Sequence, residues 1–370
     1  QAPEVSGEEQ QTAARMTLEL KRAGADRIWT GLGGHGVAAE FKGRKQGPTV
    51  LIRCELDGLP IHEVSDLPYR STIAGKGHLC GHDGHMAMVA GLAAMLAAKR
   101  PARGRVVLLF QPAEETGKGA AAVIADPRFA AIAPDYAFSL HNLPGQAVGR
   151  VALCTGPANC ASRGMRISLT GKTSHAAAPQ DGISPAPAIA RLLRELPGLG
   201  TGGALDEAYA LVTVTHAQMG EPAFGIAPGA GEVWATLRTV TDAKMAELVS
   251  AAETLARKAA KDAGLHISLG YDDVFDACAN HAEAVSILNT AAETAGYPAE
   301  LRQFPQSWSE DFGQFGKSAK SAMFWLDSGE AQPQLHNPDY DFPDAALPVG
   351  IAIFAAAVAE VLERTPGRNA

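Results

Sequence analysis

The chain has 370 residues and a formal net charge of −8 at pH 7, and 46% of its residues are hydrophobic while 19% are charged. This length is usual for two packed domains, and the composition is that of a globular protein rather than a disordered or fibrous one. The acidic balance argues against nucleic acid or an anionic membrane surface as a partner. The longest apolar runs, 86–98 and 349–359, are shorter than the roughly 20 residues that span a bilayer, so we expect buried helices there.

The cysteines are few and odd in number. Five cysteines in a chain of this length do not form the pattern of a disulfide-stabilised secreted domain. We therefore expect reduced thiols and a cytoplasmic location.

Buried strands alternate with apolar helices in the first and last parts of the chain. Short apolar runs that end in polar or turn residues predict parallel strands, and apolar residues at helical spacing predict helices. In chain order we expect a helix at 12–23, a strand at 49–54, a helix at 86–98, strands at 106–110 and 136–140, a helix at 282–295, a strand at 322–326 and a helix at 349–362. This alternation is typical of an α/β fold with helices on both faces of the sheet.

The middle of the chain has a different rhythm. In order we expect a strand at 165–170, a helix at 185–196, strands at 209–217 and 232–239, a helix at 243–263 and a strand at 266–270. The order β-α-β-β-α-β is that of ferredoxin-like α+β domains. We therefore predict a smaller domain, 160–272, inserted into a larger domain formed by 1–159 and 273–370.

A segment rich in histidine precedes the helix at 86–98. Residues 78–85 read His-Leu-Cys-Gly-His-Asp-Gly-His. In an extended stretch Cys80 and His82 would point to the same side, and thiolate and imidazole are good ligands for zinc and related transition metals. The alternative is a histidine-rich loop at a helix start.

Three further segments place polar residues just after, or soon after, predicted strands. Glu114 and Glu115 follow one strand, His141 ends another, and His336 lies beyond a third. Neighbouring residues of an extended chain point to opposite sides, so one carboxylate could bind a metal while the other faces the substrate water. Each segment alone also fits a surface or structural role.

Their joint placement favours one site. Asp57, Glu114, Glu115 and His141 all follow the carboxyl ends of predicted parallel strands, which is where open α/β sheets bind their ligands. The candidate metal ligands are Cys80, His82, Glu115, His141 and His336. Five ligands exceed the usual need of one zinc ion, which favours two metals with a bridging group.

A glycine-rich segment gives a different signal. Residues 31–36 fit the pattern G-x-G-x-x-G, but the following residues, 37–41, predict a strand rather than a helix. A tight turn is therefore expected there and not a dinucleotide site.

The chain as a whole resembles the amidohydrolase branch of the aminoacylase/carboxypeptidase metallopeptidase family, which includes N-acyl-amino-acid, hippurate and auxin-conjugate hydrolases. The matching motifs span nearly the whole chain, and the pairing of Cys-Gly-His-Asp with Pro-Ala-Glu-Glu is specific. They lie at 3–6, 55–60, 80–85, 111–115, 141–145, 171–179, 309–312 and 335–336.

The resemblance implies a fold, a site and a reaction. The fold is a mixed sheet like that of metal-dependent exopeptidases, with an inserted lid and dimerisation domain, and the small-molecule substrate is an amide. The residues that match the five candidate ligands hold two divalent metals, of which Mn²⁺ or Zn²⁺ are expected first, with Co²⁺ or Ni²⁺ also tolerated. Glu114 is the general base, His175 on the lid helps to bind the reacting carbonyl, often across a homodimer, and Asp57 orients a metal ligand.

Several positions depart from the family pattern. Gln180, Ser184 and Gly225 stand on the lid where the family usually has His, Asp and Asn, and Glu55 stands where it usually has Asp. The lid grips the substrate, so the acyl group and the amine stay open. We expect hydrolysis of N-acyl amino acids or related small amides. The alternatives are a di- or carboxypeptidase acting on short peptides, and a binding protein without catalysis on the same scaffold.

Overall fold

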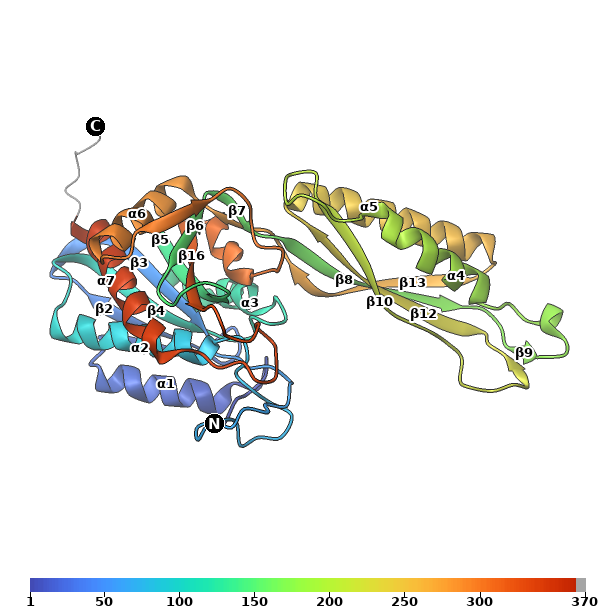
Figure 1. The fold of residues 1–370 in the computed structure, drawn as a ribbon, viewed down its shortest axis with the longest axis horizontal. Helices are drawn as coiled ribbons and strands as arrows, with labels where there is room; N and C mark the ends of the chain where they lie inside the picture. The colour runs from blue at the N-terminus through green and yellow to red at the C-terminus, as the bar shows by residue number, and fades with distance from the viewer. Residues whose placement is uncertain (364–370) are drawn as a thin grey trace. The chain divides into compact units, whose positions relative to one another are not determined.

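The computed structural model describes residues 1–363, which form two compact units (Figure 1). The first unit consists of 1–158, 278–303 and the chain from 311 onward, and the second consists of 159–277 and 304–310. The last seven residues of the larger domain expected from the sequence lie outside the described residues.

The first unit is built on a mixed sheet of eight strands. Its order is β1-β2-β4-β3-β5-β16-β6-β15. The strands are β1 (Arg27–Leu32), β2 (Gly36–Lys42), β3 (Lys45–Glu55), β4 (Arg103–Gln111), β5 (Tyr136–Pro144), β6 (Val151–Cys154), β15 (Ala299–Arg302) and β16 (Lys320–Gly329). The central strands β4, β3, β5 and β16 run parallel, so their carboxyl ends lie at one edge of the sheet.

Helices cover both faces of this sheet, as the sequence predicted. The helices are α1 (Gln10–Arg22), α2 (His82–Ala98), α3 (Gly119–Ala125), α6 (Ala282–Thr294) and α7 (Leu347–Glu363). Helices α2, α6 and α7 pack together on one face, where Val50 and Ile52 of β3 join the main apolar core (Figure 1). On the other face of β3, Arg53 pairs with Asp311 of the short 3₁₀ helix η4 (Asp311–Lys317), and α3 packs against η4.

Helix α7 is the one stretch among residues 1–363 that is long and apolar enough to cross a membrane, counted from Asp344 to Glu363. Half of its most apolar window is buried in the protein. Ile353 and Phe354 belong to the main core, so α7 has the character of a buried core helix.

Several elements differ from the sequence prediction. Strands β1, β6, β7 (Gly156–Asn159), β14 (Cys278–Asn280) and β15, together with helix α3, were not predicted. The turn expected at 31–36 is confirmed, because β1 and β2 pair as an antiparallel hairpin. The five cysteines are all free, as expected.

The second unit is a four-stranded antiparallel sheet with two helices on one face. Its elements are β8 (Ala161–Thr170), α4 (Ala186–Glu195), β10 (Ala210–Met219), β12 (Ala230–Thr239), α5 (Asp242–Asp262) and β13 (His266–Phe275). Inward residues such as Val233 and Leu237 pack against apolar residues of α4 and α5 in a separate core. The strand order β10-β12-β8-β13 confirms the ferredoxin-like prediction.

Candidate metal centre and active site

Cys80 and His82 lie at the start of helix α2. Gly81 has φ +88°, a conformation that favours glycine, and it turns the chain so that His82 becomes the first helical residue. The sequence prediction of an extended stretch, with the helix beginning at Met86, is therefore wrong. The two side chains still come close together, and both are buried.

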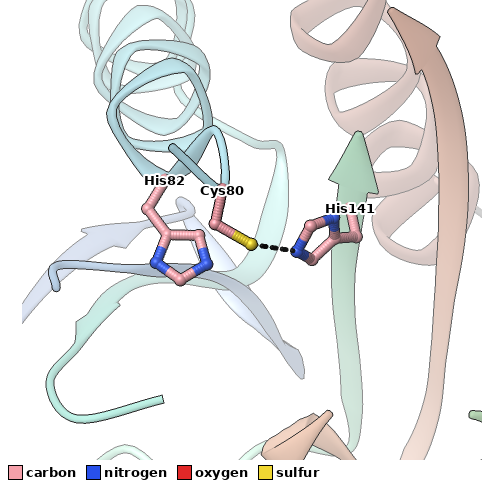
Figure 2. Close-up of side chains that lie close together, drawn as sticks. All are labelled: Cys80, His82 and His141. Carbon is pink, nitrogen blue, oxygen red and sulfur yellow. Dashed lines mark hydrogen bonds between the residues drawn. The ribbon is translucent and has the colours of Figure 1, made fainter. Parts of the chain in front are cut away.

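His141 meets Cys80 from the carboxyl end of strand β5 (Figure 2). Its Nε2 atom lies 3.5 Å from Cys80 Sγ, and its Nδ1 atom is hydrogen-bonded to the carbonyl oxygen of Asn142 at 2.8 Å. The second bond leaves Nε2, the atom that faces Cys80, as the coordinating nitrogen.

Glu114 and Glu115 follow strand β4 in a tight turn. Ala113 has φ +51°, and Gly117 N–H donates to the Glu114 carbonyl, so this segment is not extended. The expectation that the two carboxylates point to opposite sides is therefore wrong: both offer oxygens within 4.8 Å of each other and of His82.

Their contacts nevertheless differ. Glu115 Oε1 lies 3.9 Å from His82 Nε2 and 3.6 Å from His336 Nε2. Glu114 Oε1 instead accepts a hydrogen bond from Asp311 N–H at 3.4 Å. Glu115 therefore faces the histidines, while Glu114 is anchored by the backbone at the start of η4.

His336 reaches the cluster from a loop beyond β16. Its backbone N–H donates to the Leu79 carbonyl at 2.8 Å, which ties this loop to the segment that carries Cys80. Its φ of +67° is uncommon for a residue with a side chain, and such strain concentrates at functional sites. About half of the side chain is exposed.

The five predicted ligands form two overlapping groups. Cys80, His82 and His141 offer ligand atoms within 4.8 Å of one another, and so do Cys80, Glu115 and His336. Cys80 belongs to both groups, which is the arrangement expected of a thiolate shared by two cations.

Unpartnered polar atoms show that this cluster of side chains fits cations. His82 Nε2 and Glu115 Oε1 are buried and have no hydrogen-bond partner within residues 1–363. Buried polar atoms are normally satisfied, because leaving one unpaired costs about 1–3 kcal/mol. A bound cation would satisfy both atoms at once.

The electrostatics of the metal-free chain point the same way. Burial and the nearby carboxylates of Glu115 and Glu114 raise the pKa of the Cys80 thiol well above its usual range. Burial would lower the pKa of His82, but the hydrogen bond to Asp57 and the charges of Glu55 and Glu115 raise it to about 10. The site thus carries an excess of negative groups that positive charge stabilises.

Asp57 is a buried residue that contacts two of these ligands. Its carboxylate Oδ2 accepts hydrogen bonds from Ser6 Oγ at 2.7 Å and from Glu115 N–H at 3.0 Å. Its carbonyl oxygen is 2.8 Å from His82 Nδ1, and its Oδ1 is 3.5 Å from the same atom. One residue therefore contacts the segments that carry two of the candidate ligands.

Comparison with known proteins places this site in a family. The model of peptidase family M20/M25/M40 matches residues 51–360. The chain belongs to this family. The resemblance inferred from the motifs is thereby confirmed, and the M20 chain is an amide-bond hydrolase with a mixed α/β fold.

Individual proteins that are similar to this chain support the same family assignment. The M20 chain is 28% identical to N-acetylcysteine deacetylase of Bacillus subtilis over 98% of its length and 94% of that protein. It is 29% identical to hippurate hydrolase of Campylobacter jejuni, covering 95% and 92% of the two chains. A solved dinuclear metal-binding M20 peptidase from Bacillus subtilis superposes with a TM-score of 0.81 at 27% identity, covering 98% of this chain and 95% of that one. The similarity to this dinuclear peptidase supports two divalent metals in the chain described here.

His175 lies in the second unit of the M20 chain. It ends the short strand β9 (Ser174–His175), which pairs with β11 (Ile226–Ala227). Its Nδ1 accepts a hydrogen bond from Ala177 N–H at 3.0 Å, and the residue is exposed. Its imidazole is therefore held by local backbone and open to a ligand.

A buried polar network beside the metal centre was not assigned a role from the sequence. Arg53 of β3 pairs with Glu55 and with Asp311, whose Oδ1 lies 2.6 Å from Arg53 Nη2. Glu55 Oε2 in turn lies 2.7 Å from His85 Nδ1, and Gln111 Nε2 donates to Asp311 at 2.9 Å. The available signal was a charged residue within an apolar strand, because arginine is seldom fully buried unless paired.

A substitution at Gly119 tests the turn that carries Glu114 and Glu115. A Cβ atom on this residue would lie 1.7 Å from the Pro112 carbonyl oxygen, a backbone atom that cannot move without shifting the turn. We expect Gly119→Ala to lower the free energy of unfolding by about 1–3 kcal/mol and to reduce kcat. Chemical denaturation and initial-rate assays measure the two effects.

A matched glycine provides the control for this variant. Gly198 has no atom within 4 Å of its added Cβ, so Gly198→Ala should change neither stability nor rate by more than a small amount. Equal effects of the two substitutions would contradict the role given to the turn.

Proposed function

We propose that the protein hydrolyses the amide bond of an N-acyl amino acid or a related small amide. The observation that carries this proposal is the pair of ligand groups that share Cys80 and lie against Glu114. Cys80, His82, Glu115, His141 and His336 would hold two divalent cations, with Mn²⁺ or Zn²⁺ expected and Co²⁺ or Ni²⁺ also compatible with this mixture of sulfur, nitrogen and oxygen.

The chemistry divides between the cations and the chain. When bound, two divalent cations polarise the amide carbonyl and lower the pKa of water at the site. Glu114 accepts the proton of the attacking water while the water oxygen bonds to the amide carbon. The same carboxyl group then gives this proton to the amine nitrogen as the carbon–nitrogen bond breaks. The products are a carboxylate and an amine.

Two further residues have supporting roles in this proposal. Asp57 would orient His82 and fix the turn of Glu115 through the contacts described above. His175 would donate a hydrogen bond to the oxygen of the reacting carbonyl, where negative charge develops.

We also propose that the protein is a cytoplasmic homodimer formed through the second unit. Exposed apolar side chains on that unit support an interface: Phe224 is fully exposed, Ile226 is 59% exposed and Met219 is 48% exposed.

The names of the relatives support small N-acylated substrates. Acetylated amino acids are substrates of the related deacetylases, and hippurate is the benzoylated amino acid cleaved by the Campylobacter relative. The lid departures at Gln180, Ser184 and Gly225 leave the acyl group and the amine undetermined.

A substrate panel tests the proposed reaction. We expect the metal-loaded protein to hydrolyse N-acetyl or N-benzoyl amino acids with a kcat/KM at least about tenfold above that for dipeptides, a difference of about 1.4 kcal/mol in transition-state binding. Amine release measured by a fluorogenic reagent gives the rates. A higher kcat/KM for dipeptides than for every N-acyl amino acid in the panel would indicate a peptidase. No turnover of any amide would favour a binding protein without catalysis.

A further inference from the structure

Asn142 is a fully buried residue next to the candidate ligand His141, and its side chain has no part in the reaction described above. It lies near the carboxyl end of strand β5. Its contacts reach segments that carry four of the five candidate ligands.

The first contact is to His141 itself. The Asn142 carbonyl oxygen lies 2.8 Å from His141 Nδ1, so the orientation of the His141 ring depends on where this peptide group lies. A ligand imidazole is usually fixed in this way by a partner on its second nitrogen.

The second contact is to helix α2, which begins with the ligand His82. Asn142 Oδ1 is 2.8 Å from His85 Nε2, and His85 Nδ1 is 2.7 Å from Glu55 Oε2. The amide is therefore anchored through His85 to a buried carboxylate that is itself paired with Arg53. This chain of contacts lies wholly within the first unit.

The third contact is to Gly81, which separates Cys80 from His82. A Cβ atom built on Gly81 would lie 2.2 Å from Asn142 Oδ1, so the amide fills the space beside the turn that brings these two ligands together. The fourth contact is from Asn142 Nδ2 to the Tyr340 hydroxyl, in the loop that follows His336.

We infer that Asn142 is a positioning residue whose side-chain amide holds the Cys80–His82 turn in the geometry that binds the cations, while its backbone carbonyl holds the His141 ring. The inference rests on the ligand set proposed above. An apolar side chain of the same size would fill the space but would leave His85 and the Tyr340 hydroxyl without this partner. The amide is suited to the position because it both accepts and donates.

Cobalt binding to the metal-free protein tests this role. Co²⁺ alone is the probe, and thiolate-to-cobalt absorption reports on the Cys80 ligand. We expect Asn142→Ala to weaken cobalt binding by about 10-fold, the lower end of the usual effect of changes around a metal ligand, because the backbone carbonyl that holds His141 remains in the variant. The thiolate absorption at saturation should also fall, because the turn that carries Cys80 loses its support. Tyr340→Phe, which removes one hydrogen-bond partner of the amide, should have a smaller effect in the same direction.

Asn280 gives a matched control for the general cost of losing a buried asparagine. It is also buried in the first unit, and its amide bonds to the backbone of Cys154 and Met323. We expect Asn280→Ala to lower the melting temperature at least as much as Asn142→Ala while leaving the cobalt affinity unchanged. Equal cobalt affinity in Asn142→Ala and the wild type, or an equal loss in the two alanine variants, would overturn the inference.

Two further outcomes keep the test decisive. If Asn142→Ala does not fold, Tyr340→Phe decides, and wild-type affinity and absorption in that variant would overturn the inference. Cys80→Ser separates the inference from its basis. If Cys80→Ser keeps wild-type cobalt affinity, the proposed ligand set is wrong, and the role inferred for Asn142 is wrong as well. If Cys80→Ser loses binding and the Asn142 and Tyr340 variants do not, the ligand set stands and only the positioning role fails.

Discussion

Replacement of Glu114 by Gln is expected to lower kcat by about 10³-fold, within the range usual for loss of a general base. The glutamine keeps the size of the side chain and can still accept a hydrogen bond from Asp311 N–H, but it cannot take up a proton. KM and metal content should change little, because the candidate ligands remain in place. Steady-state kinetics and elemental analysis of the same preparation measure these quantities.

The control for this variant is an exposed glutamate on the second unit. Glu247 lies on α5 with a side chain that is 68% exposed, so Glu247→Gln should keep the wild-type rate. If Glu114→Gln keeps more than about a tenth of the wild-type kcat, the reduction is smaller than the usual contribution of a general base, and the assignment of Glu114 as the base is contradicted.

Loss of Arg53 is expected to have the largest effect on stability. Arg53, Glu55 and Asp311 are buried almost completely, and Arg53→Leu would leave two carboxylates without their guanidinium partner. Removing one member of a buried ion pair typically costs about 3–5 kcal/mol. Denaturant titration at neutral pH measures this loss. Arg150→Leu, which breaks an exposed pair with Glu300, should cost less than about 1 kcal/mol.

The pH dependence of this variant follows from the charges. Burial alone would raise the pKa of Glu55, but Arg53 and His85 hold it well below its usual value. In the wild type this carboxylate therefore contributes stability that is full above the unfolded-state pKa and is lost only as the pH falls through the lower folded-state pKa. In Arg53→Leu the folded-state pKa of Glu55 rises, so protonation at lower pH removes the cost of burying an unpaired carboxylate. The difference in free energy of unfolding between the wild type and Arg53→Leu should therefore become smaller between about pH 7 and pH 5. A gap that stays constant over this range would contradict the account.

Much of the candidate site follows from one regularity in the sequence. Apolar runs identify the parallel strands, and polar residues such as His141 follow the runs directly. Because parallel strands end at one edge of the sheet, residues distant in sequence can be expected at one place. The two units could be anticipated for a similar reason, since the spacing of strands and helices changes in the middle of the chain.

Other features depend on packing that no local pattern reports. The start of α2 at His82 depends on the positive φ of Gly81, and the space for that turn depends on Asn142, which is 61 residues further along the chain. Strand β1 is partly exposed and lacks the continuous apolar run of a buried strand. The contacts of Arg53 with Asp311 join residues 258 apart in sequence, so only the folded chain reveals that a charged residue within a strand is paired.

Metal content tests the central claim most directly. The metal-free protein is loaded with Zn²⁺ or Mn²⁺, separated from unbound ions by gel filtration and analysed for metal per chain. The wild type is expected to retain two equivalents, and His141→Ala and His336→Ala, which each remove a ligand from a different group, should each retain fewer. One equivalent or none in the wild type, or two equivalents in both variants, would contradict a dinuclear centre built on the shared thiolate of Cys80.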